Sequence, residues 1–283
     1  MLRSMQRVPP HVYFVGSAIF HYLGPAFAVL LFARVDALGV AWLRIASAAL
    51  VFALWRRPWR ALRELDRGTL VAWGGVLALM NCCFYLAIDR LPLATVAAIE
   101  FLPVVGLAAL GARTPRNAAA LLLAVPGVYL LTGIRLEGET LGVALAFANA
   151  GLFAVYIVLA HRAAQGEGVD ALGAAMLVAA VVVTPLAGAE ALPALSDPVA
   201  LLAGVGVGIS SSVIPYVFDQ LAMARLARAT YALLVSLLPA TAAIIGVVVL
   251  SQVPSPAEAA GVMLVIAGVA LHRAPEPVPA PAG

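Results

Sequence analysis

The sequence predicts an all-α integral membrane protein with ten transmembrane helices, arranged as two inverted five-helix repeats. Three observations predict this: the composition, ten long apolar segments, and motifs that recur in the two halves. Hydrophobic residues make up 64% of the 283 positions and charged residues only 11%, against about 45–50% and about 25% in soluble domains. A soluble fold of this size could not bury so much apolar surface.

The ten apolar segments are each long enough to cross a bilayer, whose hydrocarbon core of about 30 Å requires about 20 apolar residues. They are separated by short stretches rich in Arg, Pro and Gly, which are typical of loops. Too little sequence remains for a further soluble domain. The predicted helices occupy residues 11–33, 37–55, 68–88, 93–111, 117–133, 141–160, 171–188, 201–221, 229–250 and 257–272.

The arginines predict the orientation, because positively charged loops are retained on the cytoplasmic side. All 17 basic residues are Arg. With the amino terminus inside, thirteen lie in cytoplasmic segments, three lie in outer loops (Arg34, Arg90 and Arg135), and Arg44 lies within a helix. We therefore expect both termini in the cytoplasm and a retained first helix instead of a cleaved signal peptide. Scattered arginines also argue against nucleic-acid binding and favour the lipid bilayer as partner.

Internal similarity divides the chain into two halves. Residues 86–95 and 221–230 match at six of ten positions, and the segments that open at Pro115 and Pro256 both read P-x-x-A-A and later G-V-x-L. Five helices per half would place equivalent segments on opposite membrane faces, which is an inverted repeat. We expect a first repeat at 1–136, a second at 137–273 and a disordered, Pro-rich cytoplasmic tail at 274–283. The alternative is chance similarity between Ala- and Leu-rich helices.

Three polar residues are predicted to share one depth inside the membrane. At 1.5 Å per residue, Arg44, Asn81 and Glu100 lie about 10–12 Å below the outer surface, and Tyr85 adds a hydroxyl to the face of Asn81. Intramembrane charges are costly and are functional candidates by default. A zwitterionic amino acid could offer its carboxylate to Arg44 and its ammonium to Glu100, which could also exchange a proton. The alternative is a structural ion pair between the two.

For two further ionisable residues, a functional role and an ordinary structural role are both considered. His21 could titrate near neutral pH, or it could be a hydrogen-bonded packing residue. Asp219 could take part in coupling, or it could form a surface ion pair with Arg225 and Arg228.

Uncharged polar residues and prolines complete the candidates. Amide and hydroxyl side chains commonly join membrane helices, and this is the interpretation for Asn149, Ser210, Ser211, Ser212 and Ser236. Prolines remove backbone hydrogen bonds where a helix needs to bend, although a membrane helix can also tolerate them. Those considered as bending points are Pro103, Pro215 and Pro239.

Signals of an enzyme or of a metal site are scarce. The sequence has no H-E-x-x-H, G-x-S-x-G or P-loop pattern. Cys82 and Cys83 are adjacent in an apolar segment and lack metal-ligand spacing. We expect no cofactor, no metal and no enzymatic activity, and keep an intramembrane enzyme as the alternative from another class.

Several segments resemble a known family. N-C-C-F-Y-L-A-I-D-R-L-P-L (81–93), A-I-E-F-L-P (98–103) and S-S-V-I-P-Y-V-F-D-Q-L-A-M-A-R-L (211–226) are similar to the EamA-type drug/metabolite transporters, and among them to the inner-membrane threonine/homoserine exporters. The resemblance implies two inverted five-helix halves and export of amino acids or other small metabolites from bacteria by proton exchange. It matches the family's polar helix positions to Arg44 in A-W-L-R, Asn81, Glu100 and Asp219, the last shortened from Glu.

The sequence departs from the exporters at three places. Leu238 stands where they carry an acidic residue, Ser251-Gln252 replaces a Gly-Glu pair, and Glu100 is one residue closer to Pro103. The expected function is export of threonine- or homoserine-like amino acids by proton-coupled alternating access. An exporter of another small metabolite or drug is the alternative, and the sequence fixes neither the substrate nor the oligomeric state.

Overall fold

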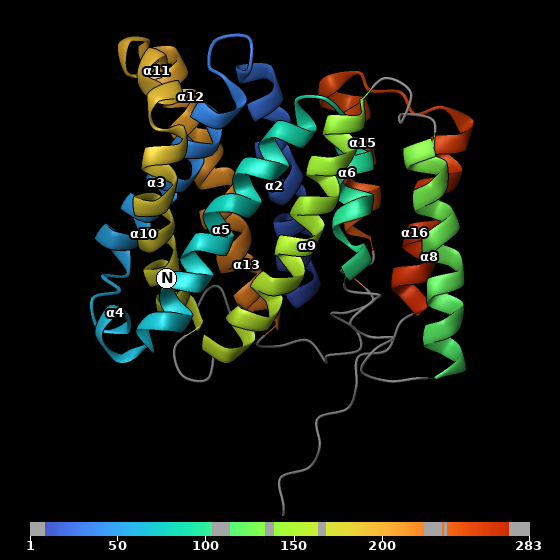
Figure 1. The fold of residues 1–283 in the computed structure, drawn as a ribbon, viewed down its shortest axis with the longest axis horizontal. Helices are drawn as coiled ribbons and strands as arrows, with labels where there is room; N and C mark the ends of the chain where they lie inside the picture. Colours follow the sequence, from blue (N-terminus) through green and yellow to red (C-terminus); the bar gives the residue numbers. More distant parts are fainter. Residues whose placement is uncertain are drawn as a thin grey trace, which may run out of the picture.

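The computed structural model is a bundle of helices that run side by side (Figure 1). It describes residues 9–103, 114–133, 139–163, 168–223, 234 and 237–271, and over these ranges the predicted all-helical fold is confirmed. The parts of predicted helices 93–111 and 229–250 that fall at 104–111, 229–233 and 235–236, with Ser236 among them, and the tail at 274–283, lie outside the described residues. In order, the helices are α2 (Pro10–Leu31), α3 (Ala37–Trp55), α4 (Ala61–Glu64), α5 (Arg67–Ile88), α6 (Leu93–Glu100), α8 (Pro115–Gly133), α9 (Thr140–Ala163), α10 (Gly168–Ala187), the 3-10 turn η1 (Ala189–Ala191), α11 (Leu192–Ser196), α12 (Pro198–Gly208), the π-helical turn η2 (Ile209–Val213), α13 (Ile214–Met223), α15 (Leu238–Leu250) and α16 (Pro256–Leu271).

Six segments of the described chain are long and apolar enough to cross a membrane. They are His11–Leu31, Ala37–Trp55, Arg67–Ile88, Thr140–Leu159, Val169–Ala187 and Pro198–Asp219. Helices α15 and α16 are apolar but shorter. These six segments fit a multi-pass membrane protein. The count of ten spans stays a prediction.

Aspartate side chains cap the N-termini of three helices at the ends of the bundle. Asp36 accepts a hydrogen bond from the backbone N–H of Leu38 at the start of α3, and Asp66 accepts one from Thr69 in α5. Such caps satisfy amide groups that have no partner within the helix. The hydrogen bonds from Thr69 hold the pKa of Asp66 below its usual 3.8. Capping therefore explains why α3 and α5 begin where their apolar segments do.

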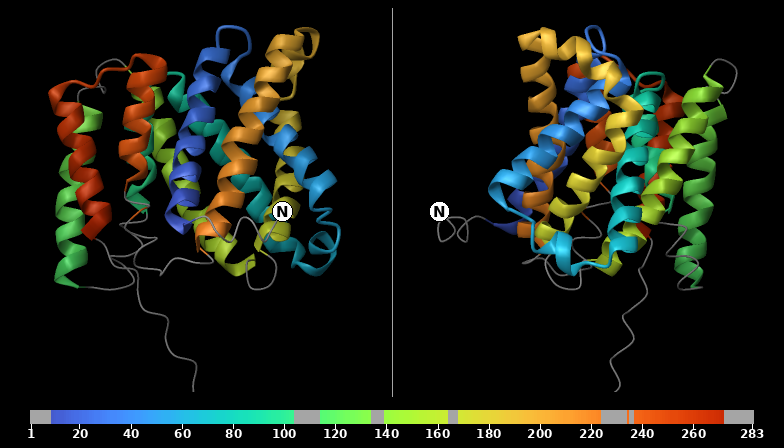
Figure 2. Two further views of the ribbon diagram at one scale, coloured as in Figure 1. Left: turned by 180° about the vertical axis from the view of Figure 1, so that it is seen from behind. Right: turned by 60° about the vertical axis from the view of Figure 1, so that its left-hand side comes forward.

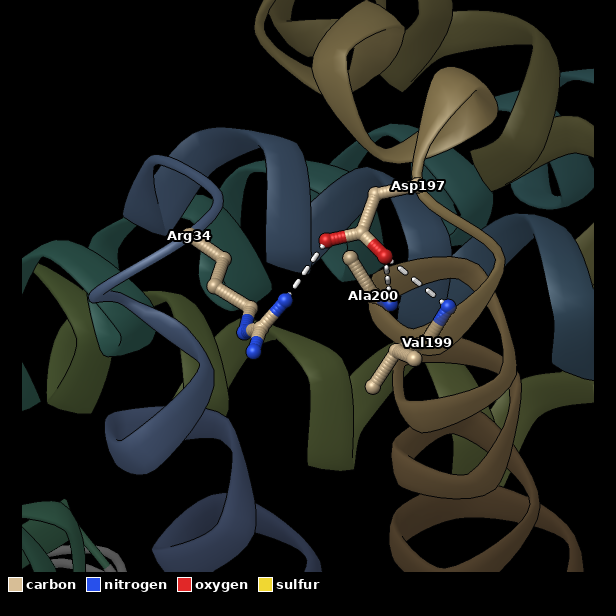
Figure 3. A network of polar contacts seen from close by, with 4 residues as sticks. All are labelled: Arg34, Asp197, Val199 and Ala200. Carbon is tan, nitrogen blue, oxygen red and sulfur yellow. Dashed lines mark hydrogen bonds and ion pairs between the residues drawn. The ribbon is translucent and has the colours of Figure 1, made fainter.

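A third cap, Asp197, also joins two distant segments (Figure 3). Its Oδ1 accepts hydrogen bonds from the backbone N–H groups of Val199 and Ala200 at the start of α12, and its Oδ2 pairs with Arg34 at 2.9 Å. Arg34 follows α2, so this contact holds the end of α2 beside the start of α12. It lies at the same end of the bundle as α11, opposite α4 (Figure 1).

The most extensive helix contacts all join a helix before residue 136 to one after it. Helix α8 packs on α16 at one edge of the bundle, which the left view of Figure 2 shows, and α5 packs on α9 and α10. Helix α3 packs on α10 and α12, α2 packs on α13 and α15, and α6 packs on α15 and α9. The core is thus built between the two parts of the chain, and few of its contacts lie within one part.

Candidate functional site

Arg44 lies in the middle of α3, with only 8% of its surface exposed. Its Nε donates a hydrogen bond to Ser212 Oγ at 3.0 Å, and its Nη2 donates to the carbonyl oxygen of Ser211 at 3.3 Å. The guanidinium also lies 5.6 Å from the ring centroid of Tyr85 in α5, a cation–π contact. These contacts hold the buried cation between α3, α5 and the turn η2.

The π-helical turn η2 makes this contact possible. It is a π-helical turn within the helix that the sequence predicts over 201–221 and that the structure has as Pro198–Asp219, and such turns are frequent at functional sites. Ser211 and Ser212 are both buried there. Two glycines let the neighbouring backbones approach: a Cβ at Gly24 of α2 would overlap Ser211 Oγ, and one at Gly208 would overlap Ser47 Oγ.

Glu100 is the last residue of α6 and is likewise 8% exposed. Its Oε1 accepts a hydrogen bond from Asn149 Nδ2 of α9 at 3.1 Å, and Asn149 is fully buried. Tyr22 of α2 lies close enough to Glu100 to interact with it electrostatically. The carboxylate at the end of α6 is therefore held by a hydrogen bond from α9.

Arg44 and Glu100 do not form an ion pair. Each interacts electrostatically with the other, but in the described part of the chain neither is within 4.0 Å of an opposite charge. The hydrogen bonds of both side chains involve neutral groups instead. The direct ion pair considered from the sequence is thus absent. Arg44 and Glu100 are two separate buried charges, which we call the two poles.

The other predicted residues lie at different distances from these poles. Tyr85 contacts Arg44, and His21 interacts with Arg44 electrostatically. Asn81 donates instead to the carbonyl oxygen of Leu77 in its own helix, at 2.8 Å. Asp219 interacts electrostatically with Tyr156 and Tyr216, which in turn interact with Arg44.

The three predicted bending prolines lie near helix ends. Pro215 is the second residue of α13, directly after η2, and Pro239 is in the first turn of α15. Pro103 follows α6. The arginines considered as partners of Asp219, at 225 and 228, lie outside the described residues.

Asn149, Ser211 and Ser212 form hydrogen bonds with the two charged side chains, although the sequence predicts for them only the joining of helices. Uncharged polar residues are frequent in membrane helices and carry no signal that separates a ligand-binding amide from a packing one. The run of three serines at 210–212 was the one available hint, because hydroxyls in succession point in several directions from a helix.

Two cavities lie away from Arg44 and Glu100. One, of about 450 Å³, opens at the bundle end that holds the loop 89–92 and is lined by Asp89, Arg90, Thr95, Gln252 and Glu258 among others. There Gln252 Oε1 accepts a hydrogen bond from the backbone N–H of Leu93 at 3.0 Å, linking the two parts of the chain. The other, about 460 Å³, is a largely apolar groove between α2 and α12. Neither Arg44 nor Glu100 lines either of these two cavities.

Comparison with known proteins gives consistent matches. The profile of the EamA-like transporter family matches residues 140–273. The threonine/homoserine exporter RhtA of Salmonella typhimurium (strain SL1344) is 32% identical over 81% of this chain and 79% of its own length. RhtA of Escherichia coli (strain K12) is 31% identical over 86% of this chain and 84% of its own. A solved crystal structure shares the fold, with TM-score 0.57 and 23% identity over 93% of this chain and 95% of that one.

Proposed function

Because this chain belongs to the EamA-like transporter family, we propose that it exports small zwitterionic amino acids, threonine- or homoserine-like first, across the bacterial inner membrane. The protein is a membrane exporter and not an enzyme, as the family and its relatives establish. The RhtA relatives carry the name of threonine/homoserine exporters, which supports that substrate class.

The separate burial of Arg44 and Glu100 is the observation that carries the substrate proposal. A cation and an anion that are both enclosed, yet bonded to neutral partners, cost more than a paired couple, since each keeps part of its desolvation penalty. A zwitterion placed between them offers a carboxylate to Arg44 and an ammonium to Glu100. Binding would then neutralise both poles at once.

Alternating access between two inverted five-helix repeats, 1–136 and 137–273, is the mechanism we propose. The helix contacts support it, because exchanging each helix for its counterpart in the other half reproduces the pattern. The contact of α5 with α9 corresponds to that of α13 with α2, α5 with α10 to α12 with α3, and α6 with α9 to α15 with α2. Equivalent halves can exchange conformations, which gives inward-open and outward-open states of similar energy.

In the proposed orientation both termini face the cytoplasm. Arg34 and Arg90 then belong to the outer end, together with α11, and the Arg-rich loop around α4 belongs to the inner end. Figure 1 has α11 and α4 at opposite ends of the bundle. The excess of arginine at the α4 end is what the positive-inside rule requires of a cytoplasmic face.

Proton exchange at Glu100 is the proposed coupling. A carboxylate inside a membrane protein is a group from which proton relays are built. Protonation of Glu100 would release an ammonium group held there. Inward movement of a proton would thus accompany outward movement of the amino acid.

Flux of labelled threonine and homoserine into proteoliposomes, with and without a pH gradient, tests the function. We expect Glu100→Gln and Arg44→Gln to lose at least about tenfold in flux, since each removes one charged contact worth about 1.5–3 kcal/mol. Arg60→Gln and Glu64→Gln are the matched controls, because they remove the same charges from an exposed ion pair. Normal flux in both buried-site variants would refute the site, and flux that ignores the gradient would refute proton coupling alone.

An exporter of another metabolite or drug of the same superfamily is the second candidate. It is favoured by Leu238 and Gln252, which stand where the resembled exporters carry acidic residues. A panel of labelled amino acids, amines and drugs in the same liposomes separates the two. Transport of a compound other than threonine and homoserine, without transport of these two, would favour the second candidate.

A further inference from the structure

Four buried polar atoms without a hydrogen-bond partner gather around the two poles. In the described part of the chain, buried side-chain polar atoms lack a partner at only five places: Tyr22 Oη, Tyr85 Oη, Asn149 Oδ1, Ser211 Oγ and the indole nitrogen of Trp73. The first four belong to residues that contact or interact with Arg44 or Glu100. Buried polar groups in native proteins are nearly always bonded, so four such atoms together indicate the place of a ligand.

The atoms beside Glu100 can act as acceptors. Asn149 donates a hydrogen bond to Glu100 through its amide nitrogen. The carbonyl oxygen of the same amide, Asn149 Oδ1, is buried and accepts no hydrogen bond. Glu100 receives no other hydrogen bond from the described residues. The hydroxyl of Tyr22, which interacts electrostatically with Glu100, can accept as well. An ammonium group carries three N–H donors and no acceptor, so this half of the region matches it.

The atoms beside Arg44 can act as donors. Arg44 donates to Ser212 Oγ through Nε and to the carbonyl oxygen of Ser211 through Nη2. The hydroxyls of Ser211 and Tyr85 are neighbours of each other, and that of Tyr85 is a neighbour of the guanidinium, but neither hydroxyl makes a hydrogen bond of good geometry. A carboxylate accepts several hydrogen bonds and donates none, so this half matches it.

We propose that Asn149 and Ser211 are substrate-binding residues, Asn149 holding the ammonium beside Glu100 and Ser211 holding the carboxylate beside Arg44. The inference rests on the proposed function and deepens it. It fixes the direction in which an α-amino acid lies between α9 and η2. It also implies that a ligand with both charged groups binds more tightly than one with a single charged group, because the latter leaves two of the buried polar atoms unpaired. Ordered water at the four atoms is the competing occupant.

Competition against labelled threonine in proteoliposomes tests the assignment with one analogue for each group. The probes are threonine, its deaminated analogue 3-hydroxybutanoate, which lacks the ammonium, and its decarboxylated analogue 1-amino-2-propanol, which lacks the carboxylate. Asn149→Leu is expected to weaken the binding of threonine and of 1-amino-2-propanol about tenfold or more and to leave that of 3-hydroxybutanoate unchanged. Ser211→Ala is expected to weaken the binding of threonine and of 3-hydroxybutanoate by several-fold and to leave that of 1-amino-2-propanol unchanged.

Trp73→Phe is the matched control, because it removes the remaining unpartnered polar atom, eight residues before Asn81 on α5, and should change none of the three affinities. If Asn149→Leu fails to insert, Asn149→Ser repeats the comparison with a smaller polar side chain. Equal weakening of all three probes by a variant would mean that water or packing occupies the site, and would overturn the inference. A wild-type protein that moves no amino acid would overturn the proposed function itself.

Discussion

Alanine at position 208 should destabilise the protein, because the added methyl group would overlap the backbone of α3. A Cβ there would lie 2.7 Å from the carbonyl oxygen of Arg44, and it would overlap Ser47 Oγ. A relaxed C···O contact is about 3.3–3.6 Å, so α12 and α3 would have to separate by a large part of an ångström. A carbonyl cannot rotate away as a side chain does. Overpacking of this kind costs about 1–3 kcal/mol.

The higher helix propensity of Ala should not offset this cost, because membrane helices keep their backbone hydrogen bonds when the bundle comes apart in the bilayer. The assay is the free energy of unfolding in mixed micelles titrated with a denaturing detergent. Gly206→Ala is the control, since a Cβ at that position meets nothing within 4 Å, and its effect should stay within about 0.5 kcal/mol. Equal stability of the two variants would refute the argument from close approach.

The remaining predictions concern hydrogen bonds of charged side chains. The backbone N–H of Ala200 and the guanidinium of Arg34 lower the pKa of Asp197 from its usual 3.8. The resulting stabilisation is present above the unfolded-state pKa and is lost as the pH falls through the lowered folded-state pKa. Asp197→Asn should therefore melt earlier than wild type at pH 7, and the difference in melting temperature should shrink as the pH falls below 3.8; a constant difference would contradict this. Ser212→Ala removes the acceptor of the buried Arg44 Nε and should cost about 1–3 kcal/mol of unfolding free energy, and unchanged stability in the same micelles would speak against that hydrogen bond.

Composition and segment length were sufficient to predict a helical membrane bundle, because the cost of exposing apolar side chains to water applies at every position. The starts of α3 and α5 lie within a residue of the predicted ones, since Asp36 and Asp66 cap them. The short helices α4 and α11 were not predicted. They lie in connections where no apolar periodicity exists, so local propensity and packing decide their form.

The charged residues of the site could be predicted and their partners could not. Arg44 and Glu100 stand out in apolar segments because charge is rare and costly there. Asn149 and Ser212 resemble many other polar residues of membrane helices, and only the packing of α9 and η2 brings them to the charges. Asn81, placed at the same depth by counting residues, instead bonds its own helix, because counting fixes height along the axis and not direction around it.

The turn η2 also determines which way α13 faces. A π turn contains one residue more than a regular helical turn, and one residue corresponds to a rotation of about 100° around an α-helix of 3.6 residues per turn. Everything after Val213, including Tyr216 and Asp219, is therefore rotated relative to α12 by that amount. Deleting a single serine would restore a regular helix and turn these side chains away from Tyr156. The three serines thus act as a spacer, whose number of residues matters for the orientation of α13 independently of what their hydroxyls bind.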